Sequence, residues 1–175
     1  MAQDKKPKTK ELATRPEANV SMLQDISQAT DIANKLKLIV VKQKLYTDIQ
    51  GKNYVNVEGW STLGAMLGVF PEVVKLERIE TNNKIEIKYL AEVRLRTMKG
   101  HSICRAQAIC SNAEKSKRNN EEYAIASMAQ TRATGKAFRM SFSWVMKMAG
   151  FEATPSEEAD GIKKSTFKEP VAPKA

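Results

Sequence analysis

Residues 84–111 read KIEIKYLAEVRLRTMKGHSICRAQAICS, and their alternation decides the fold. Apolar residues take every second position, first at Ile85, Ile87, Tyr89, Ala91, Val93 and Leu95, and then at Cys104, Ala106, Ala108 and Cys110. A period of two is typical of strands with one buried face. The MKGH between the two runs predicts a two-residue hairpin loop at Lys99 and Gly100. We therefore expect two long antiparallel strands that share an apolar face.

The sequence on either side adds two more strands and three helices. In chain order, the other predicted elements are a helix over 22–45 capped by Ser21, a short strand over 54–57, a short helix over 58–68, a strand over 72–80 and a long helix over 121–149. The strand over 72–80 completes a three-stranded meander. The expected fold class is α+β, with the meander between a short helix and a long packed helix.

The long helix carries its own apolar stripe. Its members are Ala126, Ala129, Ala133, Ala137, Met140, Trp144 and Met148. Small side chains in this stripe predict that the helix lies close against the sheet, and Gly150 is expected to end it.

The chain length of 175 residues favours one domain with tails. Residues 1–20 are polar and basic and predict a flexible arm, residues 21–155 the folded domain, and residues 156–175 a flexible tail. The N-terminus lacks the apolar stretch of a signal peptide, and no apolar run is long enough to span a membrane. We therefore expect a cytoplasmic protein, associated with the nucleoid or, if the source is viral, in the host cytoplasm.

Positive charge is concentrated within the predicted domain. The net charge is +9, and residues 91–150 carry eleven of the basic side chains against four acidic ones. Such a concentration favours a polyanionic partner, most commonly nucleic acid, although a solvated basic surface is the alternative. The candidate nucleic-acid-binding residues are Arg94, Arg96, Lys99, Arg105, Lys115, Lys117, Arg118, Arg132, Lys136, Arg139 and Lys147.

Two arrangements within this set favour a bound anion. In the predicted hairpin Arg94 faces Arg105, and like charges placed opposite each other destabilise a sheet unless an anion intervenes. On the long helix, Arg132, Lys136 and Arg139 follow the i, i+4, i+7 spacing of one face, which contains no acid. We expect these cations to line the rim of the surface on which the helix packs.

Catalytic and metal chemistry find little support in the sequence. His101, Cys104 and Cys110 are the obvious metal ligands, but they lack a ligand-pair spacing, and the register turns both cysteines towards the core. No nucleophile motif and no phosphate-binding loop occur. The acidic residues Glu58, Glu77, Glu80 and Glu92 share no spacing that would suit a nuclease. We expect no enzyme activity, no cofactor and no metal.

From about Tyr54 to Gly150 the chain resembles the single-strand annealing proteins of the Rad-fifty-two superfamily, including their phage and prokaryotic relatives. The resemblance rests on YVNVEGWSTLGAMLGVFP (54–71), AEVRLRTMKGHSICRAQAICS (91–111) and AQTRATGKAFR (129–139). In the last stretch Thr131, Ala133, Lys136, Ala137 and Arg139 match the family in kind. Arg132 stands where the family commonly has an acid, and Gly135 where it has a lysine.

This resemblance implies a function. It suggests ATP-independent binding of single-stranded DNA in a basic groove, annealing of complementary strands in recombination or repair, and assembly into rings or helical filaments. Recombination or replication proteins could dock on the tails. Two alternatives stay open: a single-strand DNA-binding protein that does not anneal, and a ring-forming structural or adaptor subunit.

Overall fold

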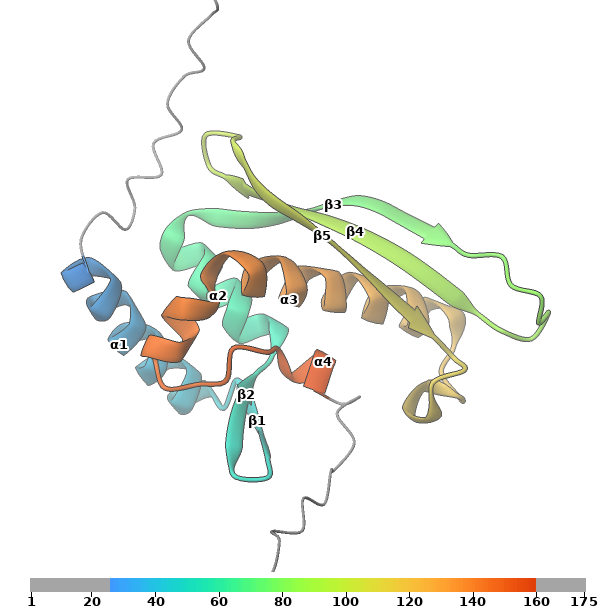
Figure 1. Cartoon of the computed structure of the whole chain (residues 1–175), viewed down its shortest axis with the longest axis horizontal. Helices are drawn as coiled ribbons and strands as arrows, with labels where there is room; N and C mark the ends of the chain where they lie inside the picture. Colours follow the sequence, from blue (N-terminus) through green and yellow to red (C-terminus); the bar gives the residue numbers. More distant parts are fainter. Residues whose placement is uncertain (1–25, 160–175) are drawn as a thin grey trace, which may run out of the picture.

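The long helix α3 (Glu122–Met148) lies between a three-stranded antiparallel sheet and the helices α1 (Ile26–Gln43) and α2 (Val57–Leu67) (Figure 1). This computed structural model describes residues 26–159. The sheet is formed by β3 (Val69–Arg78), β4 (Lys88–Thr97) and β5 (Ser102–Ser111), in that spatial order. The predicted α+β class and the meander between helices are therefore confirmed.

The hairpin between β4 and β5 has the predicted pairing but a different loop. Arg94 faces Arg105, as expected. The loop, however, has three residues, because the amide of Thr97 already bonds to the carbonyl of His101 at 2.9 Å. Gly100 adopts a φ of 83° there, which glycine tolerates best. An irregularity at Ile103, between the Arg96 and Leu95 pairs, restores the expected register.

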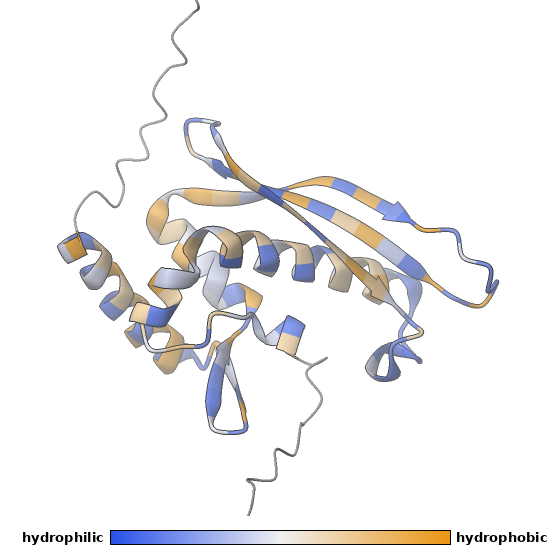
Figure 2. Ribbon diagram, viewed as in Figure 1, coloured by the Kyte–Doolittle hydropathy of each residue, from blue (hydrophilic) through white to orange (hydrophobic). Residues whose placement is uncertain are grey.

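The core forms between α3 and one face of the sheet. Alternation along β4 and β5 is visible in Figure 2, where hydrophobic and hydrophilic residues follow one another. On the inner face Ala91, Val93 and Leu95 are buried, and α3 meets them with Ala129 and Ala133. Small helix residues allow this close approach, so the predicted packing is confirmed for Ala129, Ala133 and Ala137, whereas Ala126 is only partly buried.

The second half of the predicted stripe is wrong. Phe142 has non-helical backbone angles, with φ at −133°, which kinks α3 and rotates the helix face beyond it. Trp144 and Met148 are consequently exposed, and Val145 and Met146 are buried in their place; Met140, which precedes the kink, is exposed as well. After the kink α3 ends as predicted at Gly150.

Helix α2 has clear signals at both ends. The side chain of Asn56 accepts a hydrogen bond from the Gly59 amide at 3.1 Å and caps the N-terminus. Gly68 ends the helix in the left-handed conformation, as predicted, and β3 follows directly. Gly64 faces the buried ring of Phe138 on α3, so the two helices touch through a position without a side chain.

The N-terminal half of the domain differs in detail from the prediction. Helix α1 is described from Ile26, and the predicted start at residues 21 and 22 lies outside the described residues. The short strand becomes a hairpin of β1 (Tyr46–Ile49) and β2 (Lys52–Val55). Sequence reasoning missed β1 because only Tyr46 and Ile49 of its four residues are even partly buried. Ile85, expected in β4, lies before the strand and is 82% exposed.

The predicted C-terminal tail is wrong for its first four residues. Residues 156–159 form the short helix α4 (Ser156–Ala159), and Ala159 is buried. Pro155, just before it, packs against Gly135 of α3, where even a Cβ atom would lie only 3.0 Å from the proline ring. Residues 1–25 and 160–175, which include the predicted arm and the rest of the tail, lie outside the described residues.

Candidate nucleic-acid interface

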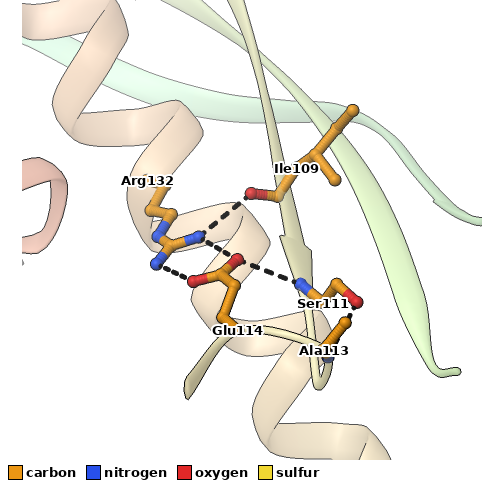
Figure 3. A network of polar contacts seen from close by, with 5 residues as sticks. All are labelled: Ile109, Ser111, Ala113, Glu114 and Arg132. Atoms are coloured by element: carbon orange, nitrogen blue, oxygen red, sulfur yellow. Dashed lines mark hydrogen bonds and ion pairs between the residues drawn. The ribbon is translucent and has the colours of Figure 1, made fainter. Parts of the chain in front are cut away.

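Arg132 of α3 is hydrogen-bonded to the C-terminal part of β5 and to Glu114 just after it. Its guanidinium donates to both carboxylate oxygens of Glu114, at 2.7 and 2.6 Å, and to the carbonyl of Ile109 at 3.1 Å (Figure 3). Glu114 also accepts from the Ser111 amide at 3.2 Å. The hydrogen bond from Arg132, more than any other contact, holds the pKa of Glu114 below its usual value. This pair is therefore charged at neutral pH and fixes Arg132 against the sheet.

Lys136 reaches the same strand one turn further along the helix. Its Nζ atom donates to the carbonyl of Gln107 at 3.1 Å. Residues 107 and 109 are alternate positions of an edge strand, so both carbonyls point away from β4. The two α3 cations thus occupy the open edge of β5 at these positions and lie at the rim of the sheet, as predicted.

Arg139 is paired with a residue of the C-terminal segment. Its Nη1 atom lies 2.7 Å from a carboxylate oxygen of Glu158 on α4. A groove of about 510 Å³ runs here between α3, β5 and α4. Its lining combines three cations with three carboxylates, namely Arg132, Lys136, Arg139, Glu114, Glu157 and Glu158.

The basic rim expected from the helix is therefore not free of acid. The helix itself supplies no acid to this face, but Glu114 and Glu158 reach it from segments before and after α3. Spacing along one helix cannot show such partners. The sequence differs from the resembled family at positions 132 and 135, and both residues make local contacts. Arg132 binds Glu114, and Gly135 leaves room for Pro155.

The arginines of the hairpin lie on the outer face of the sheet, opposite to α3. Arg94 and Arg96 share one carboxylate, that of Glu72 on β3, at 3.6 and 3.4 Å. Arg105 lies 3.4 Å from Glu92. The repulsion expected between Arg94 and Arg105 is thus relieved by acids of the neighbouring strands. Three arginines against two glutamates still leave this cluster positive.

The remaining candidate residues separate into two groups. Lys99 is exposed at the hairpin tip, and Lys115 and Lys117 form the 3₁₀ turn η2 (Lys115–Lys117), directly before Arg118. Lys147 instead lies beyond the kink, where its Nζ atom is 2.9 Å from Glu152. The Glu152 amide bonds to Asn53 of β2, so Lys147 lies beside the β1–β2 hairpin and away from β5.

Seven cations thus follow the length of β5. We call them the β5 strip: from the hairpin tip to η2 they are Lys99, Arg105, Lys136, Arg132, Lys115, Lys117 and Arg118. Ten residues of strand span about 33 Å, enough for several nucleotides of an extended strand. Arg94 and Arg96 flank the strip on the outer face of the sheet.

Other kinds of site find little basis in the described part of the chain. Within residues 26–159 no group of three His, Cys, Asp or Glu side chains could hold a metal ion. Cys110 is buried, and burial raises the pKa of its thiol. Cys104 packs against α3, with its sulfur 3.3 Å from the Ala137 carbonyl. None of the helices described is both long and apolar enough to cross a membrane.

Comparison with known proteins adds no family. The chain matches no protein-family model, and no curated protein aligns with it significantly.

Proposed function

We propose that the protein binds single-stranded DNA along the β5 strip and anneals complementary strands without ATP, in homologous recombination or DNA repair. One observation carries the proposal: cations from the hairpin, from η2 and from α3 gather along a single strand although they are far apart in the sequence. Phosphates are the ligand that such a row of Lys and Arg side chains suits.

The mechanism follows from electrostatics. Two single strands repel each other through their phosphates, and bound cations replace the counterions that would otherwise screen them. A strand held by its backbone keeps its bases available for pairing. Contacts to phosphates are independent of sequence, which annealing of any two complementary strands requires.

We also propose that the protein works as a homo-oligomer. Edge strands of a sheet tend to pair unless they are covered. The β5 edge is occupied by Arg132 and Lys136. On β3, at the other edge, Val73 and Leu76 are about half exposed, although they lie on the inner face of the sheet, which α3 covers in its central part. A neighbouring copy in a ring or filament would cover this edge.

Fluorescence anisotropy with labelled oligonucleotides tests the binding step. We expect similar affinities for homopolymeric and mixed single strands, no effect of ATP, and a linear fall of log affinity with log salt, by about 0.7 per phosphate contact. The same experiment separates the two DNA-binding hypotheses from the adaptor alternative. An affinity that does not depend on salt would contradict phosphate binding and would favour the adaptor alternative.

A further inference from the structure

Phe70 is an aromatic residue on the outer, solvent-facing surface of the sheet. It pairs with Arg96 in the register of β3 and β4, and Glu72 pairs with Arg94. Directly opposed residues of antiparallel strands lie on the same face, so Phe70 shares the face of the hairpin arginines. The side chain is 47% exposed.

Two other exposed apolar residues of β3, Val73 and Leu76, differ from Phe70 in their position. Val73 pairs with Val93, and Leu76 pairs with Ala91, both of which are buried under α3. These side chains therefore belong to the margin of the core. Phe70 lies on the opposite face, and its paired residue is an arginine.

We propose that Phe70 stacks against one base of the bound single strand while the adjacent arginines hold its phosphates. This inference rests on the proposed function and adds a base contact to it. Single-strand binding proteins combine cationic grooves with aromatic side chains, because every base offers a π-face. Arg96 lies directly opposite Phe70, where Cβ atoms are about 5 Å apart, so one nucleotide could meet both side chains.

Stacking also suits annealing. A base that rests on an aromatic ring is held by its face, and its hydrogen-bonding edge stays free for a complementary strand. The contact is tolerant of sequence, as the proposed function requires. Phe70 therefore adds affinity without selecting a base.

Three variants of one position test the contact. Phe70→Leu keeps an apolar side chain but loses the ring, and we expect its affinity for oligothymidine to fall roughly 5- to 150-fold. The salt slope should stay unchanged, because no charge is removed. Phe70→Tyr should bind like the natural protein. For a strand of abasic sugars, the natural protein and Phe70→Leu should bind equally.

The Phe70→Trp variant reports the contact directly. We expect its tryptophan emission to be quenched by oligothymidine, beyond any change in the natural protein, which contains Trp60 and Trp144. Leu38→Trp, at an exposed position of α1, is the control and should show no added quenching.

The outcomes separate this inference from the function on which it rests. If the natural protein binds single strands in a salt-dependent way and Phe70→Leu binds oligothymidine equally well, the stacking contact is refuted and the function stands. If the natural protein binds no single strand, both fail. If the Phe70→Trp emission changes with protein concentration in the absence of DNA, the ring contacts another copy of the chain, and the stacking proposal is overturned.

Discussion

Replacing Gly64 with valine is expected to destabilise the protein by about 3 kcal/mol. A Cβ atom at this position would lie 2.6 Å from the ring of Phe138 and 2.7 Å from the backbone oxygen of Val69. Neither neighbour can move easily, because the ring is fully buried and the oxygen belongs to the start of β3. Since domains of this kind unfold at a cost of about 5–15 kcal/mol, the loss should be a large fraction of the total.

Thermal and urea unfolding measure this effect. The matched control is Gly51→Ala, because Gly51 has a φ of 77° but no atom within 4 Å of the added Cβ, so only backbone strain of about 1 kcal/mol is expected. Adding Phe138→Leu to Gly64→Val should cost less than the sum of the two single losses, because the shorter side chain removes the ring contact. A Gly64→Val protein as stable as Gly51→Ala would show that α2 and α3 are not in contact here.

Removing four cations of the β5 strip should weaken single-strand binding by several hundred-fold at 0.1 M salt. The variant is Lys99→Ala, Arg105→Ala, Arg118→Ala and Lys136→Ala together. Each lost phosphate contact removes about 0.7 units of log affinity for every tenfold fall in salt concentration. At 0.1 M, one decade below 1 M salt, four contacts therefore account for roughly 2.8 units. Arg132 and Arg139 are kept, because they hold Glu114 and Glu158.

A control with the same change in charge makes the result specific. Lys35, Lys37, Lys42 and Lys52 are exposed on α1 and β2, and their replacement by alanine also lowers the net charge from +9 to +5. We expect this control to bind almost as well as the natural protein. Equal losses in both variants would mean that overall charge, and not the β5 strip, attracts the strand. Circular dichroism should show that both remain folded, since each replaced side chain lies at the surface.

Local patterns predicted the elements of the sheet and their pairing well. Alternation along residues 84–111 requires only neighbouring residues, and the pairing of Arg94 with Arg105 followed from the turn. The predicted loop is one residue too short, but the predicted pairing is still correct, because the irregularity at Ile103 shifts the register back by one residue. Gly68 and Gly150 also end their helices as predicted, since each has the positive φ that glycine accepts.

Long-range partners could not be predicted in the same way. The acids that meet the α3 cations are Glu114 and Glu158, which lie 18 and 19 residues from Arg132 and Arg139 in the sequence. No Pro or Gly stands at the kink near Phe142, so the sequence does not indicate it. The helical pattern therefore wrongly predicts that Trp144 lies in the core. Phe70 was missed because the predicted strand began at residue 72, two positions too late to include it.

The rate at which two complementary oligonucleotides anneal is the most direct test of the central claim. The account predicts that the natural protein accelerates annealing without ATP, that the four-residue variant of the β5 strip does so far less, and that the α1 and β2 control retains the acceleration. A protein that binds single strands but leaves the annealing rate unchanged, or slows it, would contradict the claim and identify a protein that only covers single strands.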